Sequence, residues 1–225
     1  MTHHARQPVP RKAAFTLIEL LAVISIIAIL AALLFAATGP ARKAGDRAKC
    51  LANFRQIGAA IGTFIADHEG QLPGPLRANQ GCWYNKTDSA TLGHQLASYL
   101  GVTLDYEKRR MDVMVCPAWQ RGAPYKDDES FLLNTEVTVN GSVINPWGDA
   151  DVGENPSSPA VPKVLVSLSD VPLSRIWAIQ DFDMQSIAKM KPPGIAAKPV
   201  HGDKRNALFF DFHVESVALD YRPLY

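Results

Sequence analysis

The sequence lacks the features that mark several large functional classes. Its 23 Lys and Arg nearly balance its 22 Asp and Glu, for a formal net charge of +1. Such a balance gives no argument for nucleic acid or another polyanionic partner. The sequence contains no P-loop, no dinucleotide fingerprint, no metalloprotease motif and no nucleophile elbow. It also lacks internal repeats and long low-complexity tracts. We therefore expect a protein that is not an enzyme and does not bind nucleic acid.

Charge is scarce near the N-terminus, where residues 15–37 form an apolar run interrupted only by Thr16, Glu19 and Ser25. A helix of this length spans roughly 35 Å, enough to cross the core of a bilayer. The apolar part of a secretory signal is shorter, but small residues near Ala36 leave a cleaved signal as the alternative. A carboxylate inside lipid costs several kcal/mol, so Glu19 is a candidate functional residue by default.

A polar leader containing Arg6, Arg11 and Lys12 precedes the sequence Phe-Thr-Leu-Ile-Glu at residues 15–19. A basic leader, this pentapeptide and a long apolar helix follow one another in a fixed order. In that order they resemble the N-terminus of type IV pilins and of type II secretion pseudopilins. By charge counting alone the orientation of the apolar helix is weakly determined. The resemblance implies that the leader stays in the cytoplasm and the body is exported.

The same resemblance implies a processing event and an assembly contact. Prepilin peptidase would cleave between Ala14 and Phe15, after which the new amine of Phe15 is methylated. Glu19 would then neutralise that amine on a neighbouring subunit. The implied partners are prepilin peptidase, other pilin or pseudopilin subunits and an inner-membrane assembly platform. The implied location is the inner membrane, crossed once, with the C-terminal domain in the periplasm or on the exterior.

The resemblance divides the chain into a leader (1–14), a long helix (15–70) and an exported domain (71–225). Within the helix we expect residues 15–37 to span the membrane and residues 38–70 to be amphipathic. We expect Pro40 to kink or locally unwind the helix, because proline removes a backbone donor. The apolar stripe that should pack on the domain comprises Leu51, Phe54, Ile57, Gly58, Ile61, Phe64 and Ile65.

Segments with strand character follow in the C-terminal part of the chain. They are residues 113–116, 131–143, 164–168, 175–180, 206–210 and 214–219. The last two predict a β-hairpin. A long helix packed on an antiparallel sheet is an α+β fold, here of the pilin-like kind.

Residues 201–214 resemble the H-x9-D-G tail of a large group of bacterial prepilin-like proteins. His201, Asp211 and His213 match this pattern, whereas Phe212 stands where the family has glycine. Glycine would supply a positive φ in the hairpin turn. We predict that His201 and Asp211 are structural partners that close the end of the sheet.

Two metal hypotheses arise in the same region. Major pseudopilins bind calcium in a C-terminal loop, and this likeness makes Asp181 and Asp183 calcium candidates. Two carboxylates fall short of the 6–8 oxygen ligands that calcium takes, so we favour the alternative that they cap a turn. Zinc bound by His201 and His213 lacks a compact ligand spacing. No cofactor is therefore firmly expected.

The chain has three cysteines, so they cannot all pair with one another. Cys50 falls near the apolar stripe, where a small buried residue is the simplest interpretation. Cys82 and Cys116 lie in the part that the resemblance places in an oxidising compartment, where a disulfide between them is possible.

Two functions remain open. The first is a filament subunit that packs its N-terminal helix against sister helices. The second is a membrane-tethered protein that binds a ligand or metal and uses the helix only as an anchor. Glu19 favours the filament subunit, because a simple anchor has no use for a carboxylate at that position.

Overall fold

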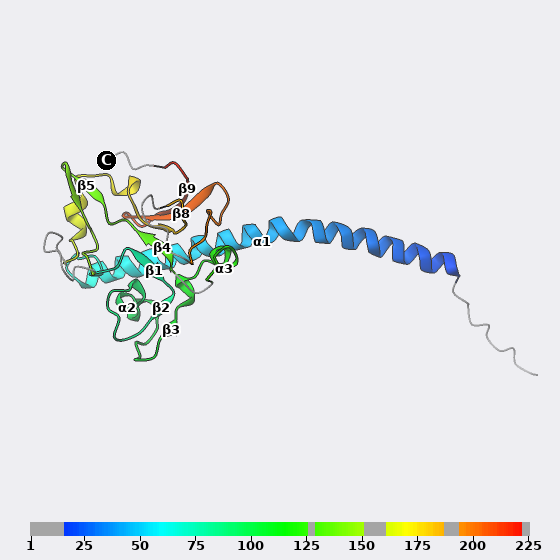
Figure 1. The fold of residues 1–225 in the computed structure, drawn as a ribbon, viewed down its shortest axis with the longest axis horizontal. Helices are drawn as coiled ribbons and strands as arrows, with labels where there is room; N and C mark the ends of the chain where they lie inside the picture. The colour runs from blue at the N-terminus through cyan, green and yellow to red at the C-terminus, as the bar shows by residue number, and fades with distance from the viewer. Residues whose placement is uncertain (1–15, 126–128, 151–160, 187–193, 222–225) are drawn as a thin grey trace, which may run out of the picture. The chain divides into compact units, whose positions relative to one another are not determined.

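A computed structural model describes residues 16–125, 129–150, 161–186 and 194–221 (Figure 1). The chain divides into two compact units, residues 1–42 and residues 43–225. The expected α+β class is confirmed, because the described residues form one long helix and a five-stranded antiparallel sheet.

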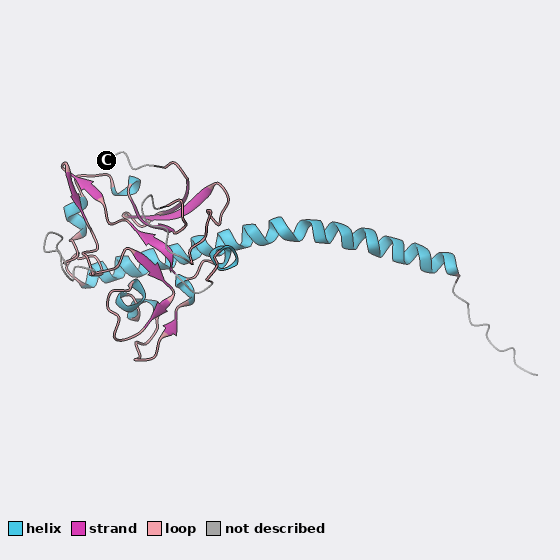
Figure 2. Cartoon of the chain, viewed as in Figure 1, coloured by secondary structure: helices cyan, strands magenta, loops and turns pink. Residues whose placement is uncertain are grey.

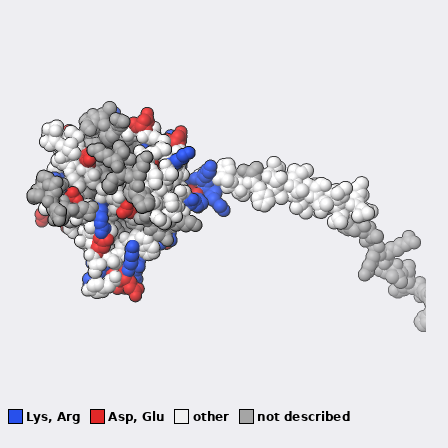
Figure 3. Space-filling view, viewed as in Figure 1, with Lys and Arg blue, Asp and Glu red and all other residues white. Residues whose placement is uncertain are grey.

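Helix α1 (Leu17–Asp67) begins in the first unit and ends in the second. Between residues 17 and 35 its large apolar side chains are exposed, and by length and composition this segment is able to span a membrane. The face of this segment that Figure 3 draws shows no Lys or Arg, and Glu19 is its one acidic residue, whereas both colours are dispersed over the second unit. The helix continues through Pro40, so the expected unwinding is wrong. A single missing donor leaves the hydrogen bonds of the adjacent turns in place.

The central sheet of the second unit has the strand order β1-β4-β7-β8-β9, and every neighbouring pair is antiparallel. Figure 2 distinguishes its strands from the helices by colour. The strands are β1 (Asn79–Gly81), β4 (Glu129–Leu133), β7 (Trp177–Asp181), β8 (Lys204–Phe209) and β9 (Val214–Ala218).

The amphipathic part of α1 packs on this sheet as predicted. Phe54, Ile57 and Ile61 are buried, and the ring of Phe54 lies 4.8 Å from that of Phe131 on β4. Gly58 allows the helix to approach β8, because a Cβ at this position would come within 2.8 Å of a methyl group of Leu208. Each buried apolar side chain of this size contributes about 1.5–3 kcal/mol, so the stripe joins the helix firmly to the sheet.

Short elements complete the second unit. Two small hairpins pair β2 (Trp83–Tyr84) with β3 (Arg109–Arg110) and β5 (Val137–Val139) with β6 (Ser142–Ile144). The short helices are α2 (Leu92–Gln95), α3 (Pro117–Gly122), η1 (Ser98–Leu100), η2 (Asp112–Met114), η3 (Leu165–Leu168) and η4 (Leu173–Arg175). The prediction of strands at residues 113–116 and 164–168 is therefore wrong. Each run is too short for the spacing of its apolar residues to distinguish a strand from a helix.

The expected C-terminal hairpin is present as β8 and β9. Its connection contains Phe212 at φ +69°, so phenylalanine adopts the conformation in which glycine was expected. This backbone conformation is unfavourable for a bulky residue. The Phe212 ring packs against the core and lies over Gly62 of α1, close enough that a Cβ on Gly62 would be 3.8 Å away. The packing of the ring offsets the cost of the turn.

Candidate functional site

The first site is the start of α1, where Glu19 closes a reciprocal cap with Thr16. One Glu19 carboxylate oxygen accepts hydrogen bonds from the Thr16 backbone amide at 2.9 Å and from its hydroxyl at 2.8 Å. The Thr16 hydroxyl in turn accepts from the Glu19 amide at 3.3 Å. This is a capping box, which satisfies donors that a helix terminus otherwise leaves unpaired. The single chain therefore has its own use for Glu19, besides any contact with a neighbour.

The predicted processing residues, Ala14 and Phe15, lie outside the described residues, so their roles stay predictions. The segment that follows them is described and leaves its apolar side chains uncovered. Leu17 is 87% exposed and Phe35 is 78% exposed. In water such a surface would be strongly unfavourable, so it requires lipid or apolar helices around it.

The second site is a buried cluster in the second unit, built around a disulfide between Cys50 of α1 and Cys116 at the start of α3. The suggested pairing of Cys82 with Cys116 is thus wrong, and Cys82 is buried outside this bond. Cys50 precedes Phe54 by four residues, so both share the helix face that packs on the domain. The apolar stripe in the sequence already indicated that Cys50 is buried, because it places Cys50 on the side of the helix that faces the interior.

His201 lies directly against the disulfide. Its Nε2 atom is 3.3 Å from Cys116 Sγ and 3.7 Å from a carboxylate oxygen of Asp181 at the end of β7. The predicted pairing of His201 with Asp211 is wrong. The six residues of β8 separate these two residues by roughly 20 Å of extended chain. Asp211 instead contacts His213 Nδ1 at 2.6 Å, within the hairpin connection.

Burial sets the protonation of His201 and Asp181. Loss of water raises the pKa of Asp181 to about 7, and the nearby Asp183 carboxylate adds to this, against lowering by the Asn206 amide and by Arg205. Burial and then the positive charge of Arg47 lower the pKa of His201 to about 4. The contact between Asp181 and His201 is consequently one between a neutral imidazole and a readily protonated carboxyl, with no strong ion pair.

Asp183 has a different partner from its neighbour Asp181. Its two carboxylate oxygens accept from the guanidinium of Arg205 at 2.7 and 3.0 Å, and one of them also accepts from the Gln185 amide. Asp181 accepts from the Asn206 amide at 2.7 Å. Both carboxylates are used within the protein and Asp183 is neutralised by Arg205, which does not favour the calcium hypothesis. The alternative hypothesis, that Asp183 caps a turn, agrees with its bond to Gln185.

Sequence reasoning did not single out Asn53 of α1. It is buried, and its side-chain amide donates to the Val115 carbonyl at 2.7 Å, next to Cys116. Among the described residues, three buried side-chain atoms have no hydrogen-bond partner: Asn53 Oδ1, Asp181 Oδ1 and Asn206 Nδ2. Asp181 contacts His201 in the cluster, and Asn206 donates to Asp181. Asn53 donates to Val115, which precedes Cys116 in the sequence.

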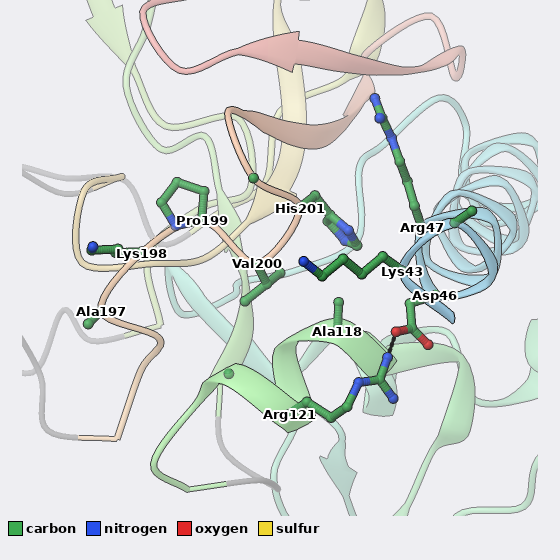
Figure 4. A pocket seen from close by; sticks show the side chains of 13 residues that line it. Lys43, Asp46, Arg47, Ala118, Arg121, Ala197, Lys198, Pro199, Val200 and His201 are labelled. Carbon is green, nitrogen blue, oxygen red and sulfur yellow. Dashed lines mark ion pairs between the residues drawn. The ribbon is translucent and has the colours of Figure 1, made fainter. Parts of the chain in front are cut away.

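A pocket of about 750 Å³ connects this cluster to the surface. It is lined by α1, by α3 and by the segment before β8, and His201 forms part of its wall. Figure 4 shows Lys43 reaching from α1 toward His201, and Arg121 paired with Asp46. Arg47 and Lys198 also line the pocket, so the charged residues of its wall are mainly basic.

Comparison with known proteins gives one match. The family described as the prokaryotic N-terminal methylation motif matches residues 9–35. No curated protein and no solved structure matches the chain. The match does not reach residues 201–214, so the tail resemblance stays a prediction. It covers Ala14, Phe15 and Glu19, the residues that the resemblance implicates in processing and assembly. The chain therefore carries, at its N-terminus, the motif that marks prepilin-type proteins.

Proposed function

We propose that this protein is a pilin-like or pseudopilin subunit of a type IV pilus-like or type II secretion filament. Prepilin peptidase removes residues 1–14, and the helix that begins at Phe15 then packs against the helices of other subunits on the assembly platform of the inner membrane. The second unit lies on the periplasmic or outer side.

The methylation motif at residues 9–35 carries this proposal, because it marks prepilin-type proteins. The exposed apolar surface of residues 17–35 supports it. A lipid anchor alone requires such a surface too, but it does not require a carboxylate in the first turns.

Glu19 connects the motif to assembly. Among the described residues of the single chain, Thr16 holds its charge, as a cap. In a filament the freed amine of Phe15 from a neighbour supplies an opposite charge in low dielectric. Such a pair sets the register between helices, because an unpaired charge in lipid is costly.

The mass of the N-terminus of the membrane-extracted protein tests processing. We expect the mature chain to begin at Phe15 with a methylated amine. A chain that retains Met1, or one that begins near Ala36, would contradict the proposal, and the second result would identify a cleaved secretory signal.

Substitution of Glu19 tests assembly. Glu19→Val should reduce crosslinking between subunits at least tenfold, since the loss of about 1.4 kcal/mol already gives that factor. Glu19→Gln is the matched control, because its amide oxygen is able to accept the two Thr16 hydrogen bonds but carries no charge. We expect both variants to lose crosslinking. Wild-type crosslinking in Glu19→Gln would show that Glu19 serves as a helix cap alone.

The second candidate function is the membrane-tethered binding protein. The basic pocket beside His201 is the observation in its favour. Crosslinking that is undiminished in both Glu19 variants, together with a chain that begins at Phe15, would favour this function.

A further inference from the structure

Three side chains with ligand atoms meet at the Cys50–Cys116 pair, and a fourth lies beside His201. The Cys50 and Cys116 sulfurs and one imidazole nitrogen of His201 all lie within 4.8 Å of one another. The fourth is Asp181, whose carboxylate oxygen lies 3.7 Å from the same His201 nitrogen, Nε2, that faces Cys116. One imidazole nitrogen therefore faces both the sulfur and the carboxylate.

These separations fit a tetrahedral metal site. Zinc binds sulfur at about 2.3 Å, nitrogen at about 2.0–2.1 Å and carboxylate oxygen at about 2.0–2.2 Å, so neighbouring ligand atoms lie about 3.3–3.8 Å apart. The distances of 3.3 Å from His201 to Cys116 and of 3.7 Å from His201 to Asp181 fall in this range. The two sulfurs are too close for such a site, because they are bonded to each other, and reduction removes that bond.

A second observation concerns Asp181, beside the three ligands: Oδ2 is the oxygen near His201 and accepts from the Asn206 amide, whereas Oδ1 is unpartnered. Asp181 is buried, and one of its carboxylate oxygens has no hydrogen-bond partner. A buried acceptor without a partner costs about 1–3 kcal/mol, and such groups in native proteins call for an explanation such as an ion or a water. Asn206, which donates to the other oxygen of Asp181, also has an unpartnered side-chain nitrogen.

We propose that reduction of the Cys50–Cys116 disulfide converts this cluster into a binding site for one zinc-type divalent cation. Cys50, Cys116 and His201 are three ligands, and Asp181 is the fourth. The carboxylate and two thiolates bring three negative charges to a cation of charge +2, and the basic side chains of the neighbouring pocket offset the remainder.

The redox step requires a dithiol as the electron donor. One thiolate of the dithiol attacks the disulfide and forms a mixed disulfide, and its second thiol then displaces the protein sulfur. The products are the thiols of Cys50 and Cys116 and the oxidised dithiol. Each thiol releases its proton to solvent when the metal–sulfur bond forms.

The pocket supplies a route from solvent to His201, so the ion need not pass through the core. Because Cys50 lies on α1 and Cys116 at the start of α3, the ion replaces the disulfide as the link between these two elements. The inference does not rest on filament assembly, since all four residues belong to the second unit.

Cobalt is a suitable probe, because a four-coordinate site with thiolate ligands gives intense visible bands and a near-ultraviolet charge-transfer band. The full chain in detergent is reduced with a phosphine, which does not compete as a dithiol would, and is titrated with Co²⁺. We expect one Co²⁺ per reduced chain, displacement by Zn²⁺, and no such bands in the oxidised chain. Zn²⁺ should also raise the unfolding midpoint of the reduced chain alone.

The variants assign the ligands. Cys116→Ser and His201→Ala should each weaken Co²⁺ binding at least tenfold, since even outer partners of metal ligands are worth about 10–100-fold. Cys82→Ala is the matched control and should keep the wild-type spectrum, because Cys82 lies outside the cluster. His201→Gln retains bulk in case His201→Ala does not fold. The proposal is wrong if the folded, reduced wild type binds no Co²⁺, or if binding survives in Cys116→Ser and in either His201 variant.

Discussion

Protein surfaces usually expose charged side chains and protein interiors usually bury apolar ones, and the two units depart from this rule in opposite ways. The first unit exposes Leu, Ile and Val along residues 17–35, whereas the second buries Asp181, Asp183 and Arg205 beneath its sheet. Each departure requires a compensating partner. The apolar surface requires lipid or apolar helices, which lie outside the chain, while the Asp183–Arg205 pair is satisfied within the chain itself. The first unit therefore depends on surroundings outside the chain, whereas the second supplies partners for most of its own buried polar groups.

The largest effect should follow from breaking a buried pair. Asp183→Asn leaves Arg205 as an uncompensated buried charge and should lower the free energy of unfolding by about 3–5 kcal/mol. Asp88→Asn is the matched control, because Asp88 pairs with Arg77 at the surface, where both side chains are 37% exposed. That change should cost at most about 1 kcal/mol. Denaturant unfolding of the full chain in detergent measures both, and equal costs would contradict the distinction between them.

The converse change introduces a charge into the exposed apolar segment. Ile27→Lys should weaken membrane insertion by about 3 kcal/mol, because lysine is costly at the centre of a spanning helix. The unfolding midpoint of the second unit should not change, since Ile27 is 58% exposed and belongs to the other unit. Alkaline extraction of membranes measures insertion, with Ile27→Leu as the control. A lowered unfolding midpoint would show that this segment supports the fold.

The Asp181–His201 contact predicts an unusual pH dependence for the oxidised, metal-free chain. Because the pKa of Asp181 is raised, the contribution of Asp181 to the free energy of unfolding falls as the pH rises from 3.8, its ordinary pKa, to about 7. Because the pKa of His201 is lowered, the contribution of His201 to the free energy of unfolding grows as the pH rises from about 4 to 6.5, the ordinary pKa of histidine. Between these limits the two contributions oppose each other, so this contact adds almost no slope to the unfolding free energy.

Asp181→Asn removes only the first contribution. The stability of this variant should therefore rise between pH 4.5 and 6 relative to the wild type, by up to about 1.4 kcal/mol per pH unit. Denaturant unfolding at a series of pH values measures the slopes. Parallel curves for the two proteins would mean that Asp181 is not held protonated in the folded state.

The smallest effect concerns the part of α1 that packs on the sheet. Gly58→Ala should lower the unfolding free energy by about 1 kcal/mol, because overpacking against Leu208 outweighs the gain in helix propensity. Gly62→Ala should be neutral or stabilising, since its new methyl group meets Phe212 at an ordinary 3.8 Å. Thermal unfolding of the two variants compares them directly. The opposite order would mean that Leu208 moves aside without cost.

Patterns of short range in the sequence predicted a large part of the molecule. The apolar run predicted the exposed segment of α1, and the stripe through Phe54, Ile57 and Ile61 predicted the face that packs on the sheet. Strands β7, β8 and β9 coincide with segments in which strand character was expected. The motif around Phe15 and Glu19 matches the N-terminal methylation motif that marks prepilin-type proteins. These features depend on neighbours within a few residues, which a single sequence records.

Only the tertiary structure decided the contents of the buried cluster. Cys50 and Cys116 are 66 residues apart, and His201 follows Cys116 by a further 85. No local period relates them, so the compartment implied by the resemblance suggested Cys82 as the partner of Cys116, and the tail resemblance suggested Asp211 as the contact of His201. They meet because α1 crosses the sheet at β8 through Gly58, and because strand pairing sets Asp181 beside Asn206. The sequence by itself determined which surfaces must be covered. The folded chain decided which polar groups meet beneath those surfaces. The physical reason is that a buried polar group depends on a partner, and that partner lies far away in the sequence.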